Sequence, residues 1–270
     1  MSLLSDFGIL VLGQKRPYAL RNVLESLQRQ DSLQLTHVWL DGHAYSPPEV
    51  VDKVKECREL AQKYNSCEWT ICNGRLGIDK LMFDALSYML EHYHKVLILE
   101  DDCFPTSFAV ELFFDQLTII ENEKDIYSVY GHHFLVPAEK ETITRFQGWG
   151  WASTREKILP ILAQLKSLYY LSEHDYLNWT KTCLNKEIKA LIDITPGRDV
   201  IKVLNNFFSW DSATTLLTAM SGLRHKKTPN QAVYNCGLGP YGGHFWTGEK
   251  LHREPPFNMI GENEVWQFFN

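Results

Sequence analysis

The first hundred residues alternate between short apolar runs and longer segments with helical periodicity. The apolar runs cover residues 7–12, 36–40, 68–72 and 96–99, and the helical segments between them cover residues 18–30, 49–64 and 78–92. Strands that alternate with helices in this order predict a mostly parallel sheet with helices on both of its faces. The pattern therefore indicates an α/β protein with a Rossmann-like sheet.

The fourth apolar run ends in three consecutive acids, Glu100, Asp101 and Asp102. Open α/β sheets bind ligands at the carboxyl ends of their strands, where three carboxylates repel one another unless a cation or several donors compensate them. A hard divalent cation, Mn²⁺ or Mg²⁺, is the simplest compensation, and it could hold a diphosphate. Alternatively, Glu100 and Asp101 face solvent and cap the next helix, predicted over residues 107–117. We favour the cation because the acids are clustered.

The loops after the first three strands carry further polar side chains. Arg16 follows the first strand, Asp41 the second, and Asn73 and Arg75 the third. All three loops would open on the same edge as the acids. Arginine matches phosphate oxygens in a bidentate way, and Asp41 could accept hydrogen bonds from a base or a ribose. Taken singly, Arg16 could cap a turn, and Asp41 could be a turn residue before Gly42.

The pattern changes in the second half of the chain. A strand is predicted over residues 126–130, helices over residues 155–170, 176–192 and 212–221, and an irregular tail from residue 229 onward. No internal repeat separates the two halves. We therefore interpret residues 1–270 as a single domain, in which residues 106–270 elaborate the sheet of residues 1–105.

Composition and motifs exclude several classes of function. The net charge is −6 and no extended cluster of lysine and arginine occurs, so a nucleic-acid surface is not expected. No transmembrane run, signal peptide, phosphate loop, G-x-G-x-x-G or G-x-S-x-G is present. The six cysteines form no C-x-x-C pair, which favours reduced cysteines in the cytosol. The sequence thus predicts a soluble cytoplasmic protein, or one peripheral to the inner membrane.

These residues resemble those of GT-A-fold glycosyltransferases. The segment Arg16-Pro17, followed by Leu20, Leu24, Ser26 and Leu27, is similar to the strand-one loop and helix of many such enzymes. The acidic triplet is similar to the metal motif of the N-acetylglucosaminyltransferase I group. Residues 148–152 (GWGWA), Trp210-Asp211 and residues 229–244 are similar to a group of bacterial hemolytic-protein-like transferases. The likeness covers most of the chain.

The resemblance implies a role for each half. Residues 1–105 would bind the nucleotide sugar, with a UDP-sugar favoured, and residues 106–270 would bind a carbohydrate, lipid-linked or protein acceptor. On the donor side, the resemblance implies eight residues that contact the nucleotide sugar or its metal. The groups they would contact are the metal, its bound water, the ribose, the base and the diphosphate. These residues are Arg16, Asp41, Asn73, Arg75, Glu100, Asp101, Asp102 and His244. Asp102 would be the main metal ligand, and His244 would approach the metal or the diphosphate from the far side.

On the acceptor side, the resemblance implies that Asp211 is the catalytic base of an inverting transfer and that Trp149 and Trp151 line an acceptor platform. Aromatic faces suit the apolar faces of sugar rings, and a carboxylate can take the proton of an attacking hydroxyl. From the residues alone, Asp211 could equally be the N-cap of the helix that follows it. The tryptophans could also be core residues.

Two departures from the bacterial group concern the acceptor and the metal. Ser153-Thr154-Arg155 lacks the second aromatic residue that usually follows the first tryptophan, and Tyr241-Gly242-Gly243-His244 stands where an acid and a threonine are common.

Two rival functions stay open. A sugar-1-phosphate nucleotidyltransferase would share the sheet but usually has a glycine-rich loop that is absent here, and a catalytically silent binding module would share the fold.

Overall fold

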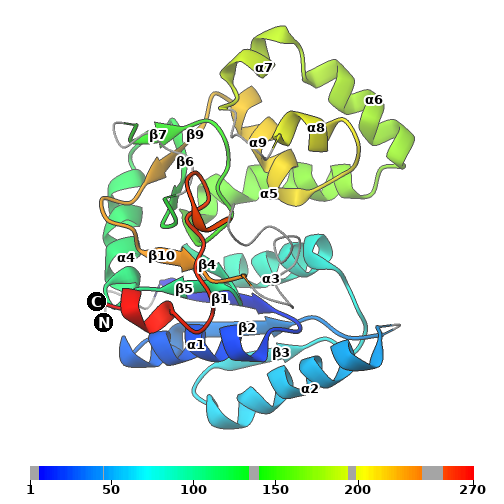
Figure 1. Cartoon of the computed structure of the whole chain (residues 1–270). Helices are drawn as coiled ribbons and strands as arrows, with labels where there is room; N and C mark the ends of the chain where they lie inside the picture. Colours follow the sequence, from blue (N-terminus) through cyan, green and yellow to red (C-terminus); the bar gives the residue numbers. More distant parts are fainter. Residues whose placement is uncertain (1–5, 45, 134–139, 194–198, 239–251) are drawn as a thin grey trace.

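A continuous sheet forms the centre of the molecule in the computed structural model, which describes residues 6–44, 46–133, 140–193, 199–238 and 252–270. Within these residues eight strands follow the order β3-β2-β1-β4-β8-β6-β9-β7, and β5 pairs with β10 beside them (Figure 1). The strands are β1 (Phe7–Gly13), β2 (Thr36–Leu40), β3 (Glu68–Ile71), β4 (Lys95–Glu100), β5 (Cys103–Pro105), β6 (Ile126–Tyr130), β7 (Thr142–Ile143), β8 (Trp151–Thr154), β9 (Arg224–Lys227) and β10 (Val233–Asn235).

The helices cover both faces of this sheet, and a lobe of shorter helices stands beyond its second half (Figure 1). The helices are α1 (Pro17–Arg29), α2 (Pro48–Lys63), α3 (Ile78–His92), α4 (Ala109–Ile120), α5 (Arg155–Tyr169), α6 (Glu173–Cys183), α7 (Lys186–Leu191), α8 (Val200–Leu204) and α9 (Trp210–Met220).

Side chains of the central strands alternate between two apolar cores. Ile9 and Val11 of β1 pack with the core that contains α1, α2 and α4, whereas Leu10 and Leu12 pack with the core that contains α3, α5 and α9. Because successive strand residues point to opposite faces, a strand buried on both sides is apolar throughout. This explains why β1 and β4 appear in the sequence as unbroken apolar runs.

The strand directions confirm the predicted fold class. Strand β1 pairs in parallel with β2 and β4, and β2 pairs in parallel with β3. Strand β8 runs antiparallel to both β4 and β6, and β9 runs parallel to β6. The first half of the chain thus supplies a parallel, Rossmann-like edge, and the second half extends the same sheet with mixed directions.

Several local predictions were wrong, and each has a physical reason. No strand was predicted between residues 130 and 155, yet Trp151 begins the buried strand β8. The helix predicted over residues 176–192 is divided into α6 and α7, because Asn185 caps α7 by accepting a hydrogen bond from the amide of Ile188. The tail, expected to be irregular, contains strand β10, which pairs antiparallel with β5. None of the described helices is long and apolar enough to cross a membrane.

Gly150 allows β8 to pack against β10. Its φ is +70°, and a Cβ atom at this residue would lie 2.6 Å from Cγ2 of Val233. A left-handed backbone conformation disfavours side chains, and the short distance adds a steric clash. Gly150 therefore leaves room for the side chain of Val233 in β10.

We predict that Gly150→Ala lowers the free energy of unfolding by about 2–4 kcal/mol, through the left-handed backbone and overpacking against Val233. Gly222→Ala is the matched control, because Gly222 has φ +69° but no heavy atom within 4 Å of the added Cβ. It should cost only about 1–2 kcal/mol. Urea denaturation of both variants measures the difference, and equal losses would show that the contact with Val233 costs nothing.

Candidate functional site

Arg16 and two buried aspartates form the centre of the candidate site. Asp101 and Asp102, at the end of β4, are 2% and 6% exposed. Nη2 of Arg16 lies 2.5 Å from Oδ1 of Asp101, and Nη1 of Arg16 donates a hydrogen bond to Oδ2 of Asp102. The amide of Gln14 donates to Oδ2 of Asp101 at 3.1 Å. The loop after β1 thus compensates two of the three acids.

The electrostatics of this group follow from its burial. Burial alone would lower the pKa of Arg16, but the charges of Asp101 and Asp102 raise it above the ordinary value. Burial raises the pKa of Asp101, while Arg16 and the amide of Gln14 oppose that rise. The acids are therefore not solvent-facing helix caps. They precede β5, and α4 begins only at Ala109.

Glu100 is the acid of the triplet that lacks this compensation. In the described part of the chain its carboxylate makes no hydrogen bond or ion pair. Burial raises the pKa of Glu100 to about 8, the charge of Asp102 adds to the rise, and Arg16 opposes it. Asp101 and Asp211 also raise this pKa. Three acids thus share one arginine at this site, and the carboxyl group of Glu100 is available at its edge.

Asp41 connects the loops that follow β2 and β3. Its Oδ1 accepts hydrogen bonds from the amides of Gly42 at 2.8 Å and Leu76 at 2.6 Å, and its Oδ2 accepts one from Gly77 at 3.0 Å. A Cβ atom at Gly42 would lie 2.4 Å from the carbonyl of Gly74, so the two loops touch. Asp41 therefore organises the rim of the site. Contact between Asp41 and a nucleotide stays a prediction.

Asn73 and Arg75 lie on this rim as exposed residues of the loop after β3. Their contacts with a donor stay predictions. His244, expected near the metal or the diphosphate, lies outside the described residues.

The segment after β10 lies against Asp102. The amide of Cys236 donates to the carbonyl of Asp102 at 2.8 Å, and the amide of Gly237 donates to Oδ1 of Asn235 at 2.9 Å. A Cβ atom at Gly237 would lie 2.4 Å from Oδ2 of Asp102. Sequence reasoning did not assign these contacts, because nothing local predicts that residues 233–235 pair with β5.

Asp211 lies in the first turn of α9 and is half-buried. Its Oδ1 accepts a hydrogen bond from the hydroxyl of Ser209 and another from the amide of Ser212 at 2.7 Å. The N-cap position belongs to Ser209, so Asp211 is not the N-cap. The charge of Asp211 contributes to the raised pKa of Glu100, which relates the second half of the chain to the acidic triplet.

The burial of Trp149 and Trp151 contradicts the predicted acceptor platform. Trp151 is 1% exposed and stacks with Tyr127 and Trp210 in the core. Trp149 is 7% exposed, and its ring lies edge-on to that of His132. Neither indole presents an open face, because β8 and the loop before it lie inside the sheet. Both residues hold the core together behind the site.

His132 joins the two segments that flank residues 239–251. Its Nε2 lies 2.8 Å from the carbonyl of Phe257, and its Nδ1 accepts a hydrogen bond from the amide of Asn235 at 3.2 Å. This pair of contacts fits the neutral ring with its proton on Nε2. Burial lowers the pKa of His132 to about 4. The ring therefore supports the segment beside Asp102 in its neutral form.

The donor atoms at this edge fit a divalent cation. Oδ1 of Asp102 receives only the weak thiol donor of Cys103, at 3.8 Å, and the carboxylate of Glu100 is unpaired among the described residues. The described residues contain no group of three or more acids, histidines or cysteines arranged to hold a metal. One or two carboxylates completed by substrate phosphate oxygens are, however, a common way to bind Mg²⁺.

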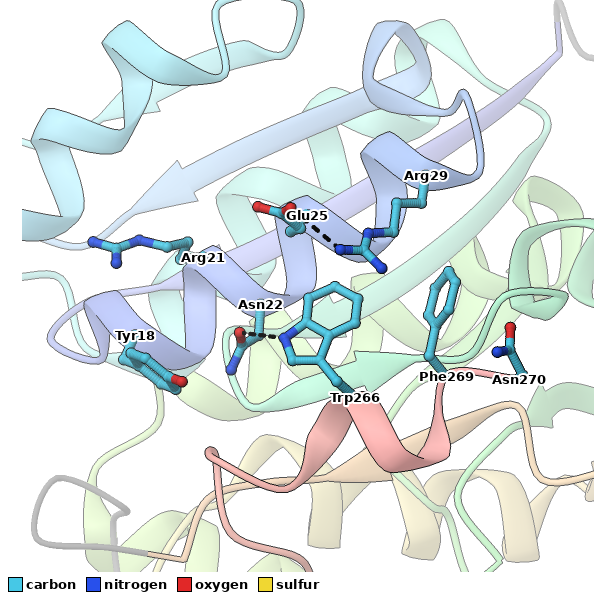
Figure 2. A pocket seen from close by; sticks show the side chains of 8 residues that line it. All are labelled: Tyr18, Arg21, Asn22, Glu25, Arg29, Trp266, Phe269 and Asn270. Carbon is cyan, nitrogen blue, oxygen red and sulfur yellow. Dashed lines mark hydrogen bonds and ion pairs between the residues drawn. The ribbon is translucent and has the colours of Figure 1, made fainter.

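A separate hollow of about 410 Å³ lies between α1 and the C-terminal 3-10 helix η3 (Val265–Phe268), as Figure 2 shows. Several of the polar side chains that line it contact other residues of the same hollow. The guanidinium of Arg29 lies 4.1 Å from the centre of the Trp266 ring and 3.6 Å from Glu25. The indole of Trp266 donates to Asn22 at 3.3 Å. This hollow contains none of the predicted site residues, and its contacts fasten the C-terminal segment to α1.

We predict that Arg16→Gln lowers the free energy of unfolding by about 3–5 kcal/mol, because it leaves buried carboxylates without their partner. Adding Asp101→Asn to Arg16→Gln should restore part of this loss. The control is Arg21→Gln, an exposed residue of α1, with an expected change within about 0.5 kcal/mol. Urea denaturation measures all three. A loss no larger than that of the control would show that the ion pairs do not stabilise the fold.

We predict that stability falls as the pH drops from 6.5 toward 4, partly through His132. Its folded pKa of about 4 lies below the ordinary value of 6.5, so the unfolded chain binds more protons in this window. His132→Gln should be less stable than the parent at pH 7.5 but lose about 1 kcal/mol less on transfer to pH 5.5. His174→Gln, at an exposed position, is the control. An unchanged pH dependence in His132→Gln would contradict the assignment.

Comparisons with known proteins find likenesses among solved structures. No family model and no curated protein matches the chain. Among solved structures it is similar to the mannosyltransferase PcManGT from Pyrobaculum calidifontis, in complex with GDP-Man and Mn²⁺, with a TM-score of 0.49 and 16% identity over 89% of this chain. The match covers 59% of that mannosyltransferase chain, so this chain spans less than two thirds of its length.

It is also similar to 4-diphosphocytidyl-2C-methyl-D-erythritol synthase from Anaerococcus prevotii, with a TM-score of 0.37 and 12% identity over 60% of this chain and 78% of that one.

Proposed function

We propose that the chain is a glycosyltransferase, which moves a sugar from a nucleoside-diphosphate sugar to a hydroxyl acceptor. One observation carries the proposal. At the carboxyl end of β4, Arg16 pairs with the buried Asp101 and Asp102, while Oδ1 of Asp102 and the carboxyl group of Glu100 have no strong partner among the described residues. These acids would hold a donor's diphosphate through a divalent cation, and Asp211 of α9 is the candidate base.

The donor would lie across the carboxyl ends of β1 to β4. The exposed Asn73 and Arg75 would contact its base or diphosphate, and the guanidinium of Arg16 would remain beside the diphosphate while paired with Asp101. Asp102 and Glu100 would hold Mn²⁺ or Mg²⁺, which when bound supplies positive charge to the departing diphosphate. A UDP-sugar is our first choice of donor.

The reaction would be a single displacement. The acceptor oxygen would bond to the anomeric carbon as the bond from that carbon to the diphosphate oxygen breaks, which inverts the configuration. Asp211 would take the hydroxyl proton during the attack. The donors on its Oδ1, Ser209 and Ser212, fix the orientation of the carboxylate. These contacts support a base role, because an oriented carboxylate loses less entropy in the transition state.

We predict that Asp102→Asn and Asp211→Asn affect different steps. Asp102→Asn should abolish the rise in melting temperature that UDP produces with Mn²⁺, because a metal ligand is lost. Asp211→Asn should keep that rise but lower kcat for transfer by about 10²–10⁴-fold, because the base is lost. Thermal shift and transfer from a panel of UDP- and GDP-sugars measure the two effects. Asp52→Asn, at an exposed site on α2, is the control for both.

Three outcomes would contradict the proposal. Pyrophosphate release from a nucleoside triphosphate and a sugar phosphate would indicate a nucleotidyltransferase. Binding of the donor without any transfer or donor hydrolysis would indicate a silent module. Full transfer activity in both variants would show that the site assignment is wrong.

A further inference from the structure

Asp79 is a partly buried acid that the proposed reaction does not use. It lies in the first turn of α3, beside the loop that carries Asn73 and Arg75. Its Oδ1 accepts a hydrogen bond from the backbone amide of Trp210, the first residue of α9, at 2.9 Å. The two residues are 131 positions apart in the sequence, so this contact connects the donor half to the helix that carries Asp211.

The amide of Trp210 needs an acceptor from outside its own helix. The first amides of an α-helix have no partner within the helix, and a serine at the N-cap usually accepts from one of them. Ser209 occupies the N-cap of α9, and an N-cap side chain accepts from the second or third helical amide, so it does not serve the amide of Trp210, the first helical residue. Asp79 therefore supplies, from another helix, an acceptor that the N-cap of α9 does not provide.

The same arrangement fixes the position of the backbone at the start of α9. Trp210 is held on its ring side by Phe146 and Trp151, and on its backbone side by Asp79. Asp211 is the next residue, so its Cα is anchored between these two contacts. Burial raises the pKa of Asp79, the amide of Trp210 opposes the rise, and the nearby charge of Asp211 adds to it.

We propose that Asp79 is a positioning residue, which holds the start of α9 and thereby keeps Asp211 in place for the transfer. The inference rests on the proposed function, in which Asp211 is the base. Asp79 itself touches neither donor nor acceptor. It acts through one backbone hydrogen bond, and an uncharged oxygen at the same place would serve as well.

The test compares variants that keep or remove this oxygen. Asp79→Asn keeps an acceptor of the same size, and Asp79→Ala removes it. We expect Asp79→Ala to lower kcat for transfer by about 10-fold or more, since misplacement of a catalytic group costs rate. KM for the donor and the donor-linked thermal shift should be unchanged. Asp79→Asn should keep kcat within about threefold of the parent, because Asn can accept the same bond.

The matched control is Asp84→Ala, on the same helix at a partly exposed position where Asp84 pairs with Lys80. It should leave kcat and KM unchanged. If Asp79→Ala does not fold, Asp79→Glu replaces it, because its carboxylate is displaced by one methylene. Loss of kcat in Asp79→Glu with rescue in Asp79→Asn would support the inference. Full kcat in Asp79→Glu would overturn it.

Amide hydrogen exchange gives a readout that does not depend on activity. The amide of Trp210 should exchange faster in Asp79→Ala than in the parent or in Asp79→Asn, and unchanged exchange would overturn the inference. If Asp79→Ala keeps full kcat while Asp211→Asn is inactive, the inference fails and the proposed function stands. If Asp211→Asn keeps full activity, the base assignment fails, and with it the role of Asp79.

Discussion

The pairing of one arginine with two buried aspartates is the interaction on which the site depends. Arg16 follows β1, and Asp101 and Asp102 follow β4, so their contact joins the carboxyl ends of two parallel neighbours. Buried charges are costly unless they are paired. The pairing with Arg16 therefore stabilises two buried acids at the end of an apolar strand, while the carboxyl group of Glu100 stays available at the edge of the site. Arg16 thus supplies, from the chain itself, part of the positive charge that the clustered acids require.

The first half of the fold was predictable because its signals are local. Runs such as Val96–Leu99 are apolar since both faces of a central strand are buried, and the helices between them have regular spacing. The second half was less predictable, because β8 and β10 depend on pairing with distant strands. Trp151 illustrates the ambiguity. Its sequence context was compatible with a sugar platform, and only the packing of Tyr127 and Trp210 on it identifies a core residue.

The candidate site was likewise predictable in its position but not in its contacts. The alternation of strands and helices in the sequence predicts parallel strands whose following loops open at one edge of the sheet. Arg16, Asp41 and the acidic triplet were therefore expected to lie together at that edge. What each residue contacts did not follow. Asp41 uses its oxygens on the amides of Leu76 and Gly77, and the acceptor for Trp210 comes from Asp79, 131 residues away. Such contacts are formed between loops, and no periodicity in the sequence records them.

The close approach of Gly237 to Asp102 constrains chain length as well as chemistry. Val233 is paired with Pro105 and Asn235 with Cys103, so the distance along the chain from β10 to Gly237 is set by the ladder. One residue inserted or deleted between Asn235 and Gly237 would replace the glycine here by a residue whose Cβ atom would lie 2.4 Å from Oδ2 of Asp102. Length variation in homologous chains should therefore be excluded from this short stretch, even where its side chains differ.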